Sequence, residues 1–65
     1  MNKLYYRTKP TVNNRVDVAI YEMIDGELKF WFALEHQKKN GIPKAIQSFL
    51  DSIEYGDIDF DIIKL

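Results

Sequence analysis

The feature that most constrains the fold of this chain is an alternation of apolar and polar residues on both sides of Asp25-Gly26. Apolar side chains occupy every second position over residues 16–20 before this dipeptide and over residues 28–34 after it. A period of two predicts strands rather than helices, because successive side chains of a strand point to opposite faces of the sheet. Asp-Gly between two such segments is a strong signal for a tight turn. The sequence therefore predicts a β-hairpin with its turn near Asp25-Gly26.

The remainder of the chain predicts two further strands and one helix. A tyrosine-rich segment, residues 4–8, is typical of a short strand. After Gly41 the apolar period changes to that of a helix, with Pro43 suited to its first turn and Gly56 suited to a left-handed residue at its end. The last segment, residues 57–65, alternates again and predicts a final strand. The apolar stripe of the helix is expected at Ile46, Phe49, Leu50 and Ile53.

The predicted order of elements is β-β-β-α-β, which indicates an α+β fold over one small domain, residues 1–65. We expect a mostly antiparallel four-stranded sheet with the helix packed on one face. The third and fourth strands are joined through the helix, and such crossovers are right-handed when the strands are parallel. Strand order 3-2-1-4, with the last strand parallel to the first, satisfies this condition. The alternative places the last strand beside the third.

Two registers are possible for the hairpin, and they differ in the face that receives Trp31. A two-residue loop at Asp25-Gly26 places Ile20 opposite Trp31 and allows a cross-strand ion pair, but it mixes apolar residues over both faces. A three-residue loop pairs Ile20 with Phe30 and collects the apolar residues on one face. The ion pair stabilises by at most about 1 kcal/mol, whereas each large apolar side chain kept in the core contributes about 1.5–3 kcal/mol. The sequence therefore favours the three-residue loop.

That register divides the sheet into a face covered by the helix and an open face. The covered face is expected to hold Leu4, Tyr6, Val16, Val18, Ile20, Leu28, Phe30, Phe32, Leu34, Ile58, Phe60 and Ile62. Tyrosine, tryptophan and methionine are enriched at protein interfaces, and the open face gathers several of them among basic residues. The candidate partner-binding residues on it are Tyr5, Arg7, Tyr21, Met23, Lys29 and Trp31.

The carboxylates of the last strand form a second candidate surface. Asp57, Asp59 and Asp61 alternate with apolar residues, so on a strand they would face one way at a spacing of about 6.5–7 Å. Beside the first strand they would lie near Lys3 and Arg7 and neutralise them. A second interpretation is an acidic contact surface that imitates a phosphate backbone. The spacing does not fit an EF-hand loop, which needs a glycine at its sixth position, and we expect no metal site.

Composition narrows the classes of function further. The chain has no cysteine, which excludes disulfides and thiolate metal sites, and its one histidine, His36, cannot anchor a metal alone. No nucleophile has a base in evident register, so we expect no catalytic residue, no cofactor and no enzymatic activity. The longest apolar run is far shorter than the roughly 20 residues of a membrane span, and the N-terminal segment has no apolar signal core. These features predict a cytoplasmic protein without a membrane partner.

The formal net charge is −1, but the charges are distributed unevenly. Residues 1–16 carry four basic side chains and no acidic one, whereas residues 51–61 carry five acidic side chains and no basic one. Such asymmetry indicates either two binding poles or two chain ends that lie together and neutralise each other. Sheet-based RNA binders combine aromatic and basic residues on an open face, but they show a clear basic footprint.

These observations predict a non-enzymatic protein-interaction domain, a small regulator or inhibitor of phage or plasmid type, which acts through the open face. Its partner is a second copy in a homodimer or another protein, and the alternative is a nucleic-acid-binding module that uses the same face. The predicted element order also resembles the degenerate ribonuclease-H-like half of some bacterial antitoxins. That likeness is one of topology and extends to no sequence motif. The acidic residues that a catalytic ribonuclease-H-like fold would carry on its first strand are missing.

Overall fold

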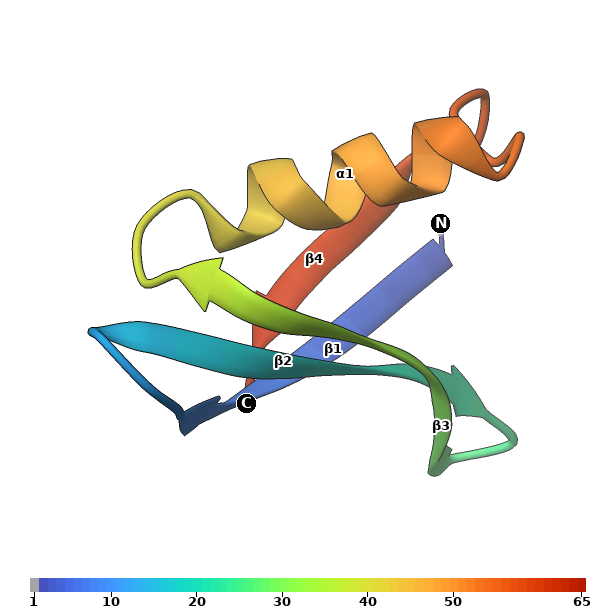
Figure 1. Ribbon diagram of the computed structural model, residues 1–65. Helices are drawn as coiled ribbons and strands as arrows, with labels where there is room; N and C mark the ends of the chain where they lie inside the picture. The colour runs from blue at the N-terminus through green and yellow to red at the C-terminus, as the bar shows by residue number, and fades with distance from the viewer. Residues whose placement is uncertain (1) are drawn as a thin grey trace.

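A computed structural model describes residues 2–65, and these residues form four strands and one helix (Figure 1). The predicted order of elements, β-β-β-α-β, is confirmed. The elements are β1 (Asn2–Pro10), β2 (Arg15–Ile24), β3 (Glu27–Lys38), α1 (Ile42–Ser52) and β4 (Phe60–Lys64).

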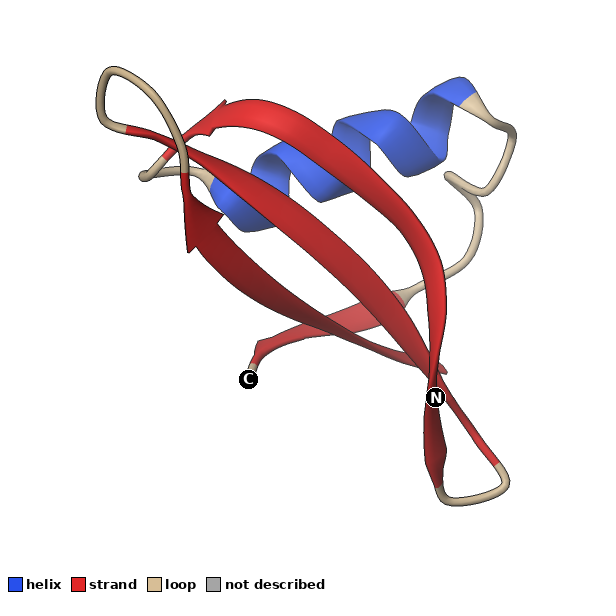
Figure 2. Ribbon diagram, turned by 60° about the horizontal axis from the view of Figure 1, so that its bottom comes forward, coloured by secondary structure: helices blue, strands red, loops and turns tan. Residues whose placement is uncertain are grey.

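The sheet has the strand order β3-β2-β1-β4, as predicted. β1 pairs antiparallel with β2, and β2 pairs antiparallel with β3. β4 lies parallel to β1, so the alternative position beside β3 is wrong. α1 packs on one face of this sheet, and in Figure 2 the strands lie in front of it. Among residues 2–65, no element covers the other face.

The core forms between α1 and the covered face of the sheet. Leu4, Val18 and Ile20 from the strands and Ile46 and Leu50 from the helix are fully buried. Partly buried side chains from β3 and β4 pack against this cluster. The ring of Phe32 on β3 stacks on that of Phe49 on the helix, with centroids 4.3 Å apart. The fully buried residues alternate along β1 and β2 and follow a helical spacing in α1, and these are the patterns that predicted the three elements.

The predicted three-residue loop of the β2–β3 hairpin is wrong. Ile24 pairs with Glu27, which leaves a two-residue loop at Asp25-Gly26. Asp25 has φ 52° and Gly26 has φ 80°, so both lie in the left-handed region. Two left-handed residues define the type I′ turn, whose twist matches that of the flanking strands and which Asp-Gly strongly favours. Local turn chemistry therefore decided the register next to the turn.

A β-bulge at Trp31 then changes the register within the hairpin. Tyr21 pairs with Phe30, whereas the preceding residue Ile20 pairs with Phe32, so Trp31 is an extra residue on β3. A bulge places two residues opposite one and re-aims the side chains that follow. The hairpin thereby keeps its favoured turn and still brings Phe32 to the covered face. Phe30, expected in the core opposite Ile20, lies on the open face instead.

A second bulge bends β3 near its end. Val18 pairs with Leu34, but Val16 pairs with Gln37, so Glu35 and His36 together oppose Asp17. His36 has φ 56°, and its backbone N–H donates to Oδ1 of Asp17 at 3.0 Å. The carboxylate thus satisfies a backbone donor that the irregular ladder leaves unpaired.

The helix begins at Ile42, and Pro43 lies in its first turn as predicted. Its end differs from the prediction, because the left-handed residue is Glu54 (φ 67°) rather than Gly56. The N–H of Tyr55 donates to the Leu50 carbonyl at 2.9 Å and that of Glu54 donates to the Asp51 carbonyl at 3.3 Å. These two bonds form a Schellman motif, which satisfies carbonyls at the helix end.

Gly56 has a different role from the one predicted. A Cβ atom at this position would lie 2.6 Å from Oδ1 of Asp51. That carboxylate oxygen also accepts a hydrogen bond from Nε2 of Gln47 at 3.1 Å. A side chain at position 56 would therefore displace the Asp51 carboxylate and disturb its hydrogen bond to Gln47, because the loop lies close to the last helical turn.

Candidate interaction surface

The open face of the sheet has at its centre a row of apolar and aromatic side chains that crosses all four strands. Phe30 on β3 pairs with Tyr21 on β2, which pairs with Tyr5 on β1, which pairs with Ile63 on β4. Directly paired residues point to the same face of a sheet, so these four side chains are neighbours. The rings of Tyr21 and Phe30 meet edge to face with centroids 5.9 Å apart. We call these four residues the bulky row.

Several large apolar side chains of this face are exposed to solvent. Phe30 is 62% exposed and Ile63 is 37% exposed, and beside them Met23 and Leu28 are 44% and 38% exposed. Met23 and Leu28 pair with each other next to the turn, on the same side as Tyr21 and Phe30. Contiguous exposed apolar side chains of this kind mark interaction sites on small proteins.

A second row, which contains two alanines, lies next to the bulky row. Ala33 on β3 pairs with Ala19 on β2, which pairs with Arg7 on β1. Leu65 follows on the β4 side, where its N–H donates to the Tyr6 carbonyl at 2.9 Å. We call Ala33, Ala19, Arg7 and Leu65 the small row, after its two alanines. Along β2 and β3 the open face therefore changes from large side chains near the turn to alanine at the next open-face position.

The charges of the open face nearly balance. Arg7 lies with its guanidinium carbon 5.9 Å from the centroid of the Tyr21 ring, a cation–π arrangement that lays its stem along the aromatic surface. Lys3 pairs with Asp61 of β4, and Lys9 pairs with Asp17 of β2. Each of the two lysines thus has a carboxylate as its cross-strand neighbour, and Arg7 is the one central charge.

Four of the six predicted partner-binding residues lie on the open face. Tyr5, Arg7 and Tyr21 are joined by cross-strand pairing or by the cation–π contact, and Met23 extends the surface toward the turn. Their positions follow from the alternation along β1 and β2. Residues 4–10 of β1 pair with residues 16–22 of β2 in a continuous register without a bulge.

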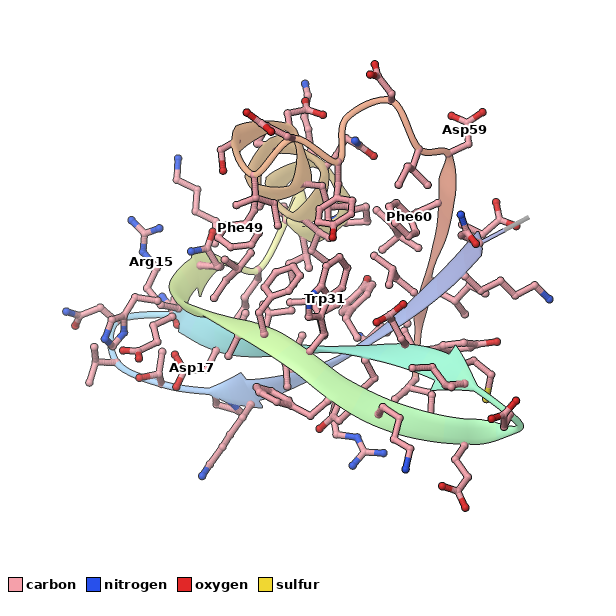
Figure 3. The ribbon with its side chains drawn as sticks, turned by 90° about the vertical axis from the view of Figure 1, so that its right-hand side faces the viewer. Arg15, Asp17, Trp31, Phe49, Asp59 and Phe60 are labelled. Carbon is pink, nitrogen blue, oxygen red and sulfur yellow. The ribbon has the colours of Figure 1, made fainter. Side chains whose placement is uncertain are left out.

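Trp31 does not lie on the open face, which corrects the prediction. Its ring centroid lies 5.1 Å from that of Phe32, 5.5 Å from that of Tyr55 and 6.3 Å from that of Phe60. Figure 3 shows Trp31 between β3 and the helix, on the same side as Phe49 and Phe60. The bulge is the physical reason, because it puts Trp31 beside Phe32 instead of on the opposite face.

The prediction for Lys29 is also wrong. Lys29 pairs with Glu22, which in turn pairs with the buried Leu4 of the covered face. Its Nζ lies 3.0 Å from Oε2 of Glu27, and both side chains are largely exposed, so this ion pair contributes little. The two-residue loop therefore places Lys29 on the same face as Glu22 and Leu4, opposite to the open face.

The residues that replace Trp31 and Lys29 on the open face are Phe30 and Leu28, and Ile63 joins them from β4. Phe30 and Leu28 were expected on the covered face, and Ile63 was assigned to neither face. A signal for the first two was present in Asp25-Gly26, since this dipeptide specifies a two-residue turn more strongly than a three-residue one. The signal for Ile63 was its alternation with Ile62 once β4 lay beside β1.

The predicted row of three carboxylates on the last strand is not formed. β4 begins at Phe60, so Asp57 and Asp59 lie in the preceding loop and only Asp61 reaches the strand. Figure 3 shows Asp59 at the outer end of β4, just before the strand begins, with its side chain pointing outward. Of the three, Asp61 alone pairs with a basic residue of β1, Lys3.

A second group of acidic residues surrounds a shallow hollow at the end of α1. Asp51, Glu54 and Asp57 line it together with Gly56, and all are exposed. Within residues 2–65, no group of three or more histidine, aspartate or glutamate side chains is arranged to hold a metal ion.

Comparison with protein-family models, with curated proteins and with solved structures found no match to this chain. In the part of the chain that the structure describes, no helix is both long enough and apolar enough to cross a membrane.

Proposed function

We propose that this chain is a non-enzymatic protein-interaction domain, a small regulator or inhibitor whose open face binds another polypeptide. The observation that carries the proposal is the bulky row, in which Phe30, Tyr21, Tyr5 and Ile63 form a continuous apolar and aromatic surface over four strands. The helix covers the opposite face of the sheet (Figure 2), so this surface has no cover within residues 2–65.

The chemistry of the row supports a protein partner. Burial of apolar surface is favourable by about 25 cal/mol per Å², and Phe30 and Met23 leave much of theirs in water. Tyrosine, phenylalanine, methionine and arginine are the side chains enriched where proteins bind one another. Tyr21 and Arg7 are already held against each other, so they lose less freedom on binding than free side chains would.

A nucleic-acid-binding module is the second candidate, and Arg7 beside Tyr5 and Tyr21 is the observation that favours it. Aromatic rings on an open sheet can stack on bases, while a guanidinium contacts phosphate. The charge balance of the face argues for the protein partner, because Asp17 and Asp61 lie beside the two lysines that would otherwise extend a basic footprint.

A photo-crosslinking amino acid at position 30 tests the proposal in the cells that produce the chain. The matched control places the same group at Val12, which is 61% exposed in the β1–β2 turn and lies outside the open face. We expect crosslinks to polypeptide from position 30 and none from position 12. Crosslinks to nucleic acid from position 30 would establish the alternative. Equal yields at both positions, or none at either, would contradict a binding role for the open face.

A further inference from the structure

We infer that the polypeptide bound by the open face is a second copy of this chain, which forms a two-fold symmetric dimer with its sheets packed face to face. This inference rests on the proposed function and names the partner of the same surface. In the arrangement that we infer, the bulky row of each copy lies over the small row of the other.

The surface of the chain is large for its mass. Its solvent-accessible area is 4792 Å², whereas a compact monomer of 7.7 kDa exposes about 4,300 Å². The radius of gyration of the Cα atoms is 11.7 Å, and a compact domain of this length has about 10.7 Å. A sheet covered on one side explains both differences, and burial of the open face would remove the excess area.

The broad side of the molecule is large enough to hold a dimer interface of standard size. The two longer extents of the molecule are 35 Å and 24 Å, so its broad side covers at most about 840 Å². Each partner of a standard-size interface contributes about 800 Å². Two copies that pack over most of this side would therefore form an interface of ordinary size, without a contribution from α1.

Near neutrality makes the face suitable for pairing with itself. Two identical faces bring like charges together, so a strongly basic or acidic face would repel its copy. Here Asp61 lies beside Lys3 and Asp17 beside Lys9, and Arg7 lies over the Tyr21 ring. These charges are at the margins of the bulky row or are spread over an aromatic surface.

The bulky row and the small row beside it select the orientation of the two copies. Packed layers interdigitate when large side chains oppose small ones. A two-fold axis that runs across the strands, between the bulky row and the small row, sets Phe30 over Ala33 of the partner subunit. The same axis sets Tyr21 over Ala19 of the partner subunit. Packed sheets keep their strand directions within about 30° of each other, which this axis allows.

At the other two positions of the rows, the same axis sets larger side chains over each other. Tyr5 lies over Arg7 of the partner subunit, which permits a second cation–π contact, and Ile63 lies over Leu65 of the partner subunit. An axis parallel to the strands would instead set the bulky rows on each other. Ala33 and Ala19 would then lie over Leu65 and Arg7 of the partner subunit. The stacked bulky rows would hold the two sheets apart on their side, which leaves gaps beside them.

The mass of the purified chain in solution tests the dimer. Sedimentation equilibrium at concentrations from about 10 μM to about 1 mM should give twice the monomer mass of 7.7 kDa at the upper end. We expect Phe30→Ser to weaken association at least about tenfold, because it removes the central anchor. Val12→Ser is the control, and it should leave association unchanged. Circular dichroism establishes that both variants fold. A monomeric wild-type chain at about 1 mM, or an unchanged Phe30→Ser dimer, overturns the inference.

Isotope-filtered NMR tests the orientation, since the alanines of the chain are at positions 19, 33 and 45 only. In an equal mixture of alanine-methyl-labelled and unlabelled chain, the Ala19 and Ala33 methyl groups should show contacts to aromatic protons of the other copy. Ala45 lies on α1 and should show none. Intermolecular contacts at Ala45, or contacts between the two bulky rows without the alanines, overturn the inferred arrangement.

The two proposals fail in different ways. A chain that stays monomeric in solution but crosslinks from position 30 to a different protein retains the proposed function and loses the dimer. A chain that yields no polypeptide crosslink from position 30, as self or as partner, loses both.

Discussion

The two faces of the sheet carry similar residue types but differ in what covers them. On the covered face, Phe32 stacks on Phe49 of the helix at 4.3 Å and joins the core. On the open face, Phe30 contacts Tyr21 at 5.9 Å and remains 62% exposed. Phe30 and Phe32 are two positions apart on one strand, and a regular strand would place them on the same face.

The bulge at Trp31 produces this difference. With one extra residue between the two phenylalanines, β3 sends one of them to each face and adds Trp31 to the covered one. The covered face thereby gains two adjacent aromatic rings beneath a short helix. The open face gains an aromatic ring that stays largely exposed. The bulge thus adds packed rings to one face and, under the proposed function, a binding residue to the other.

The largest predicted effect is the difference in the free energy of unfolding between substitutions at Phe32 and at Phe30. Phe32→Ala removes a ring that packs on the core and should lower the free energy of unfolding by about 3 kcal/mol. Phe30→Ala should change it by no more than about 0.5 kcal/mol in the monomer. Urea denaturation at a concentration below that of self-association measures both values. Similar losses for the two variants would show that the faces do not differ in this way.

Trp31→Ala is expected to have the next largest effect, about 2 kcal/mol, because the indole packs among the rings of Phe32, Tyr55 and Phe60. The same urea titration measures it, and the matched control is Lys29→Ala on an exposed part of the same strand. Wild-type fluorescence adds a second readout, since the emission of the only tryptophan should shift to the red on unfolding. An unchanged midpoint for Trp31→Ala would place the indole on the open face after all.

Substitutions in the Asp25-Gly26 turn, which fixes the register near the bulge, should have a smaller effect on the free energy of unfolding. Asp25 has φ 52°, a conformation that aspartate and asparagine tolerate but alanine does not. Asp25→Ala should lower the free energy of unfolding by about 1 kcal/mol, and Asp25→Asn should leave it within about 0.5 kcal/mol. In a three-residue loop position 25 would be right-handed and would accept alanine. Equal stability of the two variants in thermal unfolding would therefore favour that loop.

The order of the elements and of the strands could be predicted because each depends on a signal of its own. The alternation over residues 16–20, the helical spacing around Ile46 and the position of Pro43 identify the elements. The crossover through α1 then restricts β4 to a position parallel with β1. Four of the six candidate residues on the open face follow from β1 and β2, whose ladder is regular where they lie.

The register of β3 could not be predicted from its period, because two signals of similar strength disagree. Asp25-Gly26 favours a two-residue turn, and the apolar pattern beyond it favours a register that this turn does not give. These two signals exclude each other in a regular strand, but the bulge at Trp31 satisfies both by changing the register partway along β3. The apolar period of β3 does not itself indicate a bulge at Trp31, because a single large residue fits either register. The error moved Phe30 and Trp31 to each other's face.

The smallest predicted effect on folding is that of Ala33→Thr. This substitution tests whether association through the open face can be changed without a loss of monomer stability. Ala33→Thr adds a β-branched residue on an edge strand, so it should change monomer stability by less than about 0.5 kcal/mol and in the stabilising direction. Lys29→Thr makes a similar gain in strand propensity on the same strand but lies opposite Glu22, away from the open face. Thermal unfolding at low concentration should therefore give small shifts of the same sign for both variants.

The two variants should differ in sedimentation. Ala33→Thr fills the position that Phe30 of the partner subunit would occupy, so the apparent mass at high concentration should fall toward that of the monomer. Lys29→Thr should leave it unchanged. Loss of association in both variants would mean that the edge of β3, rather than the open face, joins the two copies. Retention in both would mean that the small row accepts bulk, which the interdigitated packing of the two rows does not allow.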